Sequence, residues 1–185
     1  DNIGYIYISD FDGGCADEFT QKYKELKKQG IEKLIIDIRN NGGGIVDEAI
    51  NILKLITDKG DTLLITKDKN ENEKITKNDK DPIINMPIVV LTNEYSASAS
   101  EIMTGALKDN EKATIIGTIT YGKGVMQELA PLKSGGALKI TIEEFKTPNG
   151  NTINKKGIDP DIEVEDDKKT ELDEQLQKAI EECKK

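Results

Sequence analysis

IVVLTNEYSASASEI, residues 88–102, gives the strongest indication of how this chain folds. Its first five residues form an unbroken run of aliphatic and β-branched side chains, which is typical of a strand covered on both faces of a sheet. Small residues follow, and we expect a helix over residues 98–107. A buried strand that leads directly into a helix is the basic unit of an α/β fold.

Strands and helices alternate on both sides of this stretch. Residues 34–38 (LIIDI) repeat the pattern of a buried strand, and Phe19, Tyr23 and Leu26 recur at the spacing of an amphipathic helix. We expect helices over residues 16–29 and 46–57 and further strands over residues 3–11, 62–66, 74–77, 114–117, 126–129 and 137–146. Residues 1–164 are therefore predicted to form one layered α/β domain.

Residues 165–185 differ in composition from the rest of the chain. They are mostly charged, and their apolar residues fit only one short helix, around Leu172, Leu176 and Ile180. We predict a charged C-terminal tail with a short helix.

Composition argues against several classes of protein. The chain has 35 acidic and 26 basic residues and a net charge of −9, whereas nucleic acids and anionic membranes are bound by basic patches. No apolar run approaches the roughly 18 residues of a membrane span. The N-terminus lacks the pattern of a signal peptide, and the abrupt start at Asp1 predicts a processed or truncated piece of a longer precursor.

The absence of histidine limits the available chemistry. A Ser-His-Asp triad, a Cys-His dyad and a His-ligated zinc site all require a residue type that this chain lacks. Cys15 and Cys183 are too few and too far apart to indicate a disulfide framework or a metal site, and they do not reveal the redox compartment. No metal or other cofactor is predicted.

The serine-rich segment YSASASEI, residues 95–102, joins the buried strand to the following helix. A helix N-terminus directs N–H groups and a positive dipole end toward any oxyanion that forms nearby, and small neighbours leave room for a substrate. The alternative is ordinary N-capping, because serine is a preferred cap residue.

Two glycine-containing segments are further candidates. In YGKGVMQ, residues 121–127, glycines leave Lys123 unobstructed, and a partly buried lysine loses its preference for the charged form and can accept a proton from a serine hydroxyl. In RNNGGG, residues 39–44, successive glycines after a strand can direct N–H groups at a ligand. A surface lysine and an ordinary glycine turn are the respective alternatives.

Taken together and in this order, these segments resemble the catalytic core of the carboxyl-terminal processing peptidases, also called tail-specific proteases. The resemblance extends from residue 3 to about residue 164. It includes GYIYISDF, DIRNNGGG, IVVLTNEYSASASEI, GTITYGKGVMQ, and TPNG with KGIDPDIEV. Many family members have proline where this chain has Gly42, a difference that changes the stiffness of the loop more than its chemistry.

The resemblance implies a Clp protease/crotonase-like β-β-α spiral and a role for each site residue. Ser98 would be the nucleophile, Lys123 the general base and Gln127 the residue that orients the lysine, while backbone N–H groups of Ala99 and of Gly43 or Gly44 would form the oxyanion hole. On a straight strand Lys123 and Gln127 would lie about 13 Å apart, so their contact requires residues 122–124 to fold back. Family members often carry an acid at the position of Asp109, to which we assign no role.

The implied function is that of a serine endopeptidase that cleaves proteins near unstructured C-termini through a Ser-Lys dyad and an acyl-enzyme. Its partners would be protein or peptide substrates rather than nucleic acid. The PDZ domain and the flanking helices of the family have no counterpart in these residues, and we expect a PDZ domain upstream in the full-length protein. The resemblance also places the protein outside the cytoplasm, in the bacterial cell envelope, and leaves its oligomeric state open.

Two other functions stay open on the same fold. A non-catalytic peptide- or ligand-binding module is favoured by the missing PDZ domain and disfavoured by the intact Ser98–Lys123 pair. A crotonase-type enzyme acting on acyl-thioesters would share only the fold, and the chain has no nucleotide-binding signature for coenzyme A.

Overall fold

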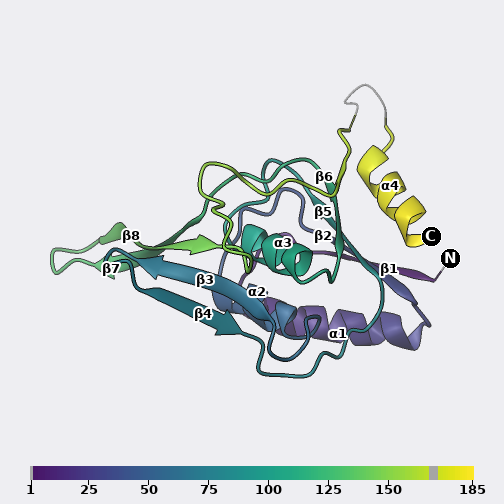
Figure 1. The fold of residues 1–185 in the computed structure, drawn as a ribbon, viewed down its shortest axis with the longest axis horizontal. Helices are drawn as coiled ribbons and strands as arrows, with labels where there is room; N and C mark the ends of the chain where they lie inside the picture. The colour runs from purple at the N-terminus through teal and green to yellow at the C-terminus, as the bar shows by residue number, and fades with distance from the viewer. Residues whose placement is uncertain (1, 167–170) are drawn as a thin grey trace.

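Two sheets and four helices make up the computed structural model, which describes residues 2–166 and 171–185 (Figure 1). The larger sheet is parallel throughout, with its strands in the order β1 (Ile3–Tyr7), β2 (Lys33–Asp37), β5 (Ile88–Thr92), β6 (Thr114–Gly117) and β9 (Ile162–Glu163). The strand of the opening stretch, β5, lies at the centre, and all five of its residues are buried. This confirms the expectation of a strand covered on both faces.

The two faces of the parallel sheet pack against separate cores, because successive residues of a strand point to opposite sides. On one face, Leu34 and Ile36 pack with α1 (Cys15–Lys28), α2 (Val46–Leu53) and α3 (Ala99–Asp109). On the other face, Ile35 packs with Ala179 and Cys183 of α4 (Glu174–Cys183). In Figure 1, α4 lies across the sheet from α1 and α2. The predicted layered α/β arrangement is confirmed.

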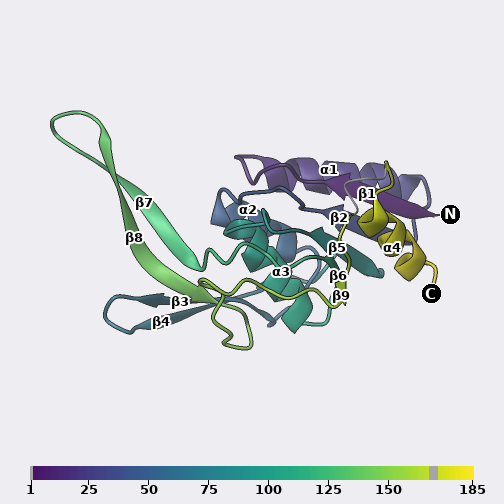
Figure 2. The same ribbon diagram turned by 90° about the horizontal axis from the view of Figure 1, so that it is seen from above.

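The second sheet is antiparallel, with its strands in the order β4 (Glu73–Lys77), β3 (Thr62–Asp68), β8 (Ala137–Lys146) and β7 (Val125–Pro131). Its strands β7 and β8 form a long hairpin that projects from the body of the molecule (Figure 2). The hairpin exposes five large apolar side chains, Leu129, Leu132, Leu138, Ile140 and Ile142.

The boundaries of some elements differ from the expected ones for identifiable reasons. The strand expected over residues 3–11 ends at Tyr7, because Tyr7 pairs with Asp37 at the end of β2 and the chain beyond it has no strand partner in this sheet. The helix expected over residues 46–57 ends at Leu53. The chain then continues in tighter turns, in which an N–H donates to the carbonyl three residues earlier, as Ile56 does to Leu53. With only two residues, β9 is too short to produce a periodic pattern.

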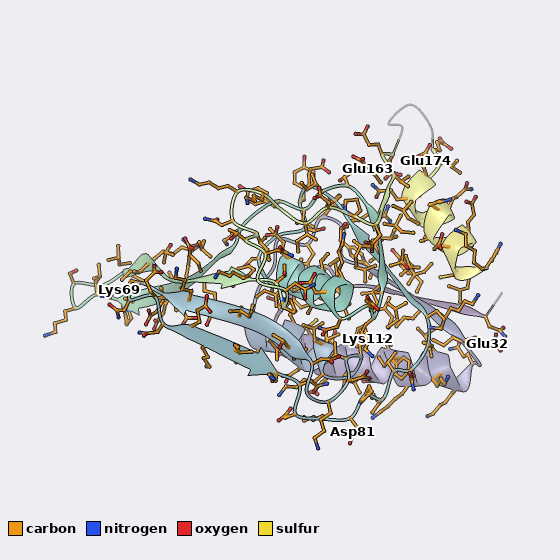
Figure 3. The ribbon with its side chains drawn as sticks, viewed as in Figure 1. Glu32, Lys69, Asp81, Lys112, Glu163 and Glu174 are labelled. Carbon is orange, nitrogen blue, oxygen red and sulfur yellow. The ribbon has the colours of Figure 1, made fainter. Side chains whose placement is uncertain are left out.

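The exposed charged residues Glu32, Lys69 and Asp81 point outward from separate parts of the chain (Figure 3). Within residues 2–166 and 171–185, no helix has both the length and the apolar character needed to cross a bilayer. The same ranges contain no group of three or more His, Cys, Asp or Glu side chains that could hold a metal ion.

The two cysteines are free and lie on opposite faces of the parallel sheet. Burial raises the pKa of the Cys15 thiol to about 11, and the carboxylates of Glu48, Glu18 and Asp12 act in the same direction. Burial also raises the pKa of the Cys183 thiol. Since the thiolate is the reactive form, neither cysteine is activated as a nucleophile.

An ion-pair network also holds α4 against the sheet. Arg39, just after β2, donates to both carboxylate oxygens of Asp173 at 2.8 Å and to Asp37 Oδ2 at 2.6 Å. Asp173 is the N-cap of α4, and its Oδ1 accepts from the Leu176 N–H at 2.8 Å.

The helix expected around Leu172, Leu176 and Ile180 is therefore packed on the core, with Leu172 just before it. Within the predicted tail, residues 167–170 lie outside the described residues, and the division at residue 164 stays a prediction.

We expect Asp173→Asn to lower the free energy of unfolding near neutral pH and to have a smaller effect in acid. Hydrogen bonds from Arg39 lower the pKa of Asp173, so its stabilising contribution is complete above the unfolded value of about 3.9 and is lost as pH falls through the folded one. Asparagine retains the capping ability. Urea unfolding at about pH 6 and about pH 3 measures the difference.

The control for this prediction is Glu181→Gln, which removes the same charge from an exposed position of α4. It should alter stability little at either pH, because exposed ion pairs contribute little. If the difference between the parent chain and Asp173→Asn does not shrink on acidification, the proposed titration of Asp173 is wrong.

Candidate active site

Three loops meet at the carboxyl end of the parallel sheet. Residues 39–44 follow β2, residues 93–98 follow β5, and residues 118–124 follow β6. Because β2, β5 and β6 are adjacent parallel strands, the loops that follow them leave the sheet at the same edge. The structure thereby places the three candidate segments of the sequence side by side.

Ser98 has an unusual backbone conformation at the start of α3. Its φ of 57° and ψ of −113° are values that residues other than glycine rarely adopt. The preceding turn is tied to the loop after β2, since Ser96 Oγ donates to the Ile38 carbonyl at 2.8 Å and the Ala97 N–H donates to the Asn41 carbonyl at 3.0 Å. Backbone strain of this kind persists only where surrounding contacts hold it in place, and it occurs most often at functional sites.

Gly43 lies directly against Ser98. A methyl group at Gly43 would lie 2.8 Å from Ser98 Cβ and from the Ala97 carbonyl oxygen, and 3.1 Å from the Ala99 nitrogen. The φ of 105° at Gly43 also belongs to the region that favours glycine. Only glycine therefore lets the loop approach the serine turn this closely.

Asn41 fixes the glycine loop from inside the protein. Its side chain is fully buried, and its Nδ2 donates to the Ile8 carbonyl at 2.9 Å while its Oδ1 accepts from the Gly43 N–H at 2.8 Å. The Asn41 carbonyl accepts from Ser100 Oγ at 2.9 Å. One residue thus joins the end of β1, the glycine loop and α3.

The backbone N–H groups around Ser98 differ in their availability. The N–H of Gly43 is occupied by Asn41, whereas the N–H groups of Gly44 and Ala99 donate to no acceptor in the described part of the chain. Ala99 is the first residue of α3, where the helix dipole is positive. An oxyanion hole requires N–H donors that, like these two, are not already bonded to another acceptor.

Lys123 lies between two buried glycines in the turn that leads to β7. A methyl group at Gly124 would lie 2.4 Å from the Asn154 nitrogen, and one at Gly122 would lie 3.0 Å from the Gly157 nitrogen. The turn therefore packs directly on the backbone of residues 154–157. Lys123 is half-buried, as expected from its apolar neighbours in the sequence.

The buried carboxylate of Glu101 connects the serine turn to the lysine turn. Its Oε2 accepts from the Ser98 N–H at 2.9 Å and from the Lys123 N–H at 2.8 Å. Its Oε1 accepts from Thr120 Oγ1 and from the Gly122 N–H, both at 2.7 Å. The backbone nitrogens of Ser98 and Lys123 therefore lie within two hydrogen-bond lengths of each other.

The side chains of the predicted dyad are not in contact. No hydrogen bond joins Ser98 Oγ to Lys123 Nζ among the described residues. Gln127 is exposed, follows a β-bulge in β7, and donates from Nε2 to Thr141 Oγ1 at 3.5 Å. The structure does not bring Gln127 to Lys123.

Asp109 lies at the opposite end of α3 from Ser98. Along the helix this separation is roughly 16 Å, and Asp109 Oδ2 accepts from the Asn149 N–H at 2.8 Å. Its contact holds the turn after β8 and lies away from the site.

Asn41 and Glu101 have no role in the sequence-based prediction. A signal for Glu101 is present, because Ser98 and Glu101 have the spacing of a capping box at a helix start. Asn41 has no comparable local signal, since its contacts to Ile8 and Ser100 join segments 33 and 59 residues apart.

Sequence comparisons match most of the chain to one family. The model of peptidase family S41 matches residues 2–164. The C-terminal processing peptidase, chloroplastic, of Tetradesmus obliquus is 36% identical over 163 residues, which cover 88% of this chain and 35% of that protein. A probable CtpA-like serine protease of Staphylococcus aureus (strain N315) is 40% identical over 165 residues, which cover 88% of this chain and 33% of that protein. The chain spans about a third of the length of the curated relatives it matches.

Solved structures share the fold. The photosystem II D1 C-terminal processing protease superposes with a TM-score of 0.81 at 36% identity, covering 88% of this chain and 42% of that one. Mature CPAF complexed with lactacystin superposes with a TM-score of 0.70 at 20% identity, covering 88% of this chain and 47% of that one. This likeness concerns the fold alone. Together with the parallel and antiparallel sheets, these likenesses confirm the predicted fold class, an α/β Clp protease/crotonase-like core.

We expect Glu101→Gln to lower the free energy of unfolding by about 2–4 kcal/mol, because the amide nitrogen cannot accept hydrogen bonds and buried N–H groups lose their partner. Urea unfolding measures the loss. Glu32→Gln is the control, since Glu32 is exposed and points outward (Figure 3). Equal stabilities of the two variants would show that the Glu101 network contributes nothing.

Proposed function

The chain belongs to peptidase family S41, and we propose that it is the catalytic core of a serine endopeptidase that cleaves proteins near unstructured C-termini. The observation that carries the proposal is the Ser98 turn. The candidate nucleophile, Ser98, lies in a strained turn at the N-terminus of α3, where the Ala99 N–H has no acceptor in the described part of the chain. The backbone N–H of Ser98 and that of the candidate base, Lys123, donate to the same carboxylate oxygen of Glu101.

The proposed mechanism is acyl transfer in two steps. Neutral Lys123 accepts the proton of Ser98, and the Ser98 oxygen attacks the peptide carbonyl. The N–H groups of Ala99 and Gly44 stabilise the oxyanion, because they have no acceptor in the described part of the chain, whereas the N–H of Gly43 donates to Asn41. Lys123 then protonates the leaving amine, and water hydrolyses the acyl-enzyme ester, which frees the new carboxyl end of the substrate and restores the Ser98 hydroxyl.

Formation of the dyad requires Lys123 to turn its side chain toward Ser98. Catalytic hydrogen bonds are often absent or long in free enzymes and tighten in the substrate complex. The lysine side chain has rotatable bonds for this movement, whereas Glu101 fixes the backbone of both turns. In our proposal Gln127 orients the lysine only if the start of β7 shifts, because Gln127 now lies beyond a bulge.

The substrates that we propose are extended, unstructured protein tails. Support comes from relatives whose names describe C-terminal processing. An extended peptide can pair with a free sheet edge such as that of β7, which begins two residues after Lys123. We further propose a PDZ domain upstream in the full-length protein and a location outside the cytoplasm, in the bacterial cell envelope.

One observation favours the second candidate, a non-catalytic peptide-binding module. In this structure the Ser98 and Lys123 side chains form no mutual hydrogen bond within the described residues, and Gln127 contacts Thr141 instead. A module of this kind would bind extended peptides at the same loops without turnover. Chemical labelling of the serine separates the two functions.

We predict that a fluorophosphonate probe labels the 185-residue chain on Ser98, because only an activated serine attacks the phosphorus. Mass spectrometry of the digested protein locates the label. Ser98→Ala should abolish labelling, and Lys123→Met should reduce it by about 10²-fold or more through loss of the general base. Label on another serine, or no label on the parent chain, would overturn the proposed activity.

We predict that Gly43→Ala slows labelling of Ser98 by about 10²-fold, because the methyl group displaces the glycine loop from the nucleophile and the oxyanion donor moves with it. Gly42→Ala is the matched control. A methyl group at Gly42 meets nothing within 4 Å, and Gly42 does not have a positive φ. Labelling rates of the two variants measure the effect, and similar rates would show that the close approach of Gly43 has no role in activity.

A further inference from the structure

The only arginine of the chain makes the densest side-chain contacts near the site. The five N–H donors of its guanidinium are all engaged, by Asp37, Asp173 and Gln175, at distances from 2.6 to 3.2 Å. The Arg39 side chain is only 13% exposed. A planar guanidinium can bridge two carboxylates with paired hydrogen bonds, whereas an ammonium cannot. In a chain with 25 lysines, this position therefore uses the one cation that is able to form the bridge.

The two carboxylates that accept hydrogen bonds from the Arg39 guanidinium lie far apart in the sequence, and Asp166 adds an ion pair at 3.7 Å. Asp37 ends β2 and is 2% exposed, and it also accepts from the Tyr5 hydroxyl at 2.7 Å. Asp173 lies 134 residues from Arg39 and is the N-cap of α4. Burial alone would lower the pKa of Arg39, but the hydrogen bonds to Asp173 and Asp37 outweigh it and raise the pKa above its usual value. Arg39 thus stays charged and links α4 to the sheet.

Arg39 is also the first residue of the glycine loop. The Arg39 N–H donates to Asp37 Oδ1 at 3.0 Å. The next residue, Asn40, exchanges two hydrogen bonds with Asn93 of the serine turn, at 2.9 and 3.0 Å. An unbroken series of contacts therefore runs from the start of α4 through Arg39 to the loops on both sides of the site.

We propose that Asp173 is a positioning residue for the active site: by holding Arg39, the docked α4 keeps the glycine loop, residues 39–44, in place against Ser98. This inference rests on the proposed peptidase function for its effect on rate. It assigns to the C-terminal helix a role beyond covering the apolar face of the sheet. Asp37 fixes Arg39 from the side of the strand, and Asp173 fixes it from the side of the helix.

The test compares Asp173→Asn with Glu181→Gln in the 185-residue chain, well below the melting temperature of each variant. Two properties are measured: the rate and half-saturation concentration of fluorophosphonate labelling, and hydrogen exchange of the three hydrogen-bonded amides of the glycine loop, those of Asn40, Asn41 and Gly43. We expect Asp173→Asn to lower the maximal labelling rate about tenfold without raising the half-saturation concentration, and to speed loop exchange about tenfold. Glu181→Gln should match the parent chain, and Asp173→Glu should recover much of the rate.

Each outcome decides the proposal. Unchanged labelling and unchanged loop exchange in Asp173→Asn would overturn it. So would faster exchange in α4 with an unaltered loop, since that result assigns Asp173 to helix docking alone. If the parent chain takes no label, the proposed peptidase activity fails, and the hydrogen-exchange comparison still decides whether Asp173 controls the loop.

Discussion

The structure of the site depends on one buried carboxylate. Glu101 accepts hydrogen bonds from four donors in two segments, and without it three N–H groups and a hydroxyl would be left unpaired, at a cost of about 1–3 kcal/mol for each buried group. It holds Ser98 and Lys123 in a fixed relation through their backbones, although their side chains do not touch. The strained φ at Ser98 persists because this carboxylate and the loop after β2 fix the turn from both sides.

The parallel sheet supplies the frame for these contacts. Its central strands are buried on both faces, so their ends are fixed by packing, and the polar loops gather at a single edge. The glycine loop can then lie against the serine turn with almost no space between Gly43 and Ser98. The antiparallel sheet contributes in a different way, by carrying the chain from Lys123 out into a long hairpin and back.

Local patterns were sufficient to predict most of the fold and the segments of the site. The apolar runs of β2 and β5, the spacing of Phe19 and Tyr23, and the glycines around Lys123 all express constraints between near neighbours in sequence. What escaped prediction depends on distant partners. Asn41 has its role through Ile8 and Ser100, Arg39 through Asp173, and the position of Gln127 depends on a bulge in β7. Neither composition nor periodicity records such pairings.

The distance in sequence between Arg39 and Asp173 has a consequence for how the protein folds. A pairing across 134 residues raises the mean separation of contacting residues, and chains with such non-local topology fold slowly, because loop-closure entropy is lost before the contact compensates for it. A nascent chain emerging from the ribosome can complete β1, β2 and α1 early, yet the guanidinium lacks the hydrogen-bonded carboxylate of Asp173 until that residue has been synthesised. Among the contacts of residues 1–185 the bridge therefore forms late, and a truncation that removes Asp173 together with α4 should leave a compact intermediate whose glycine loop is incompletely ordered.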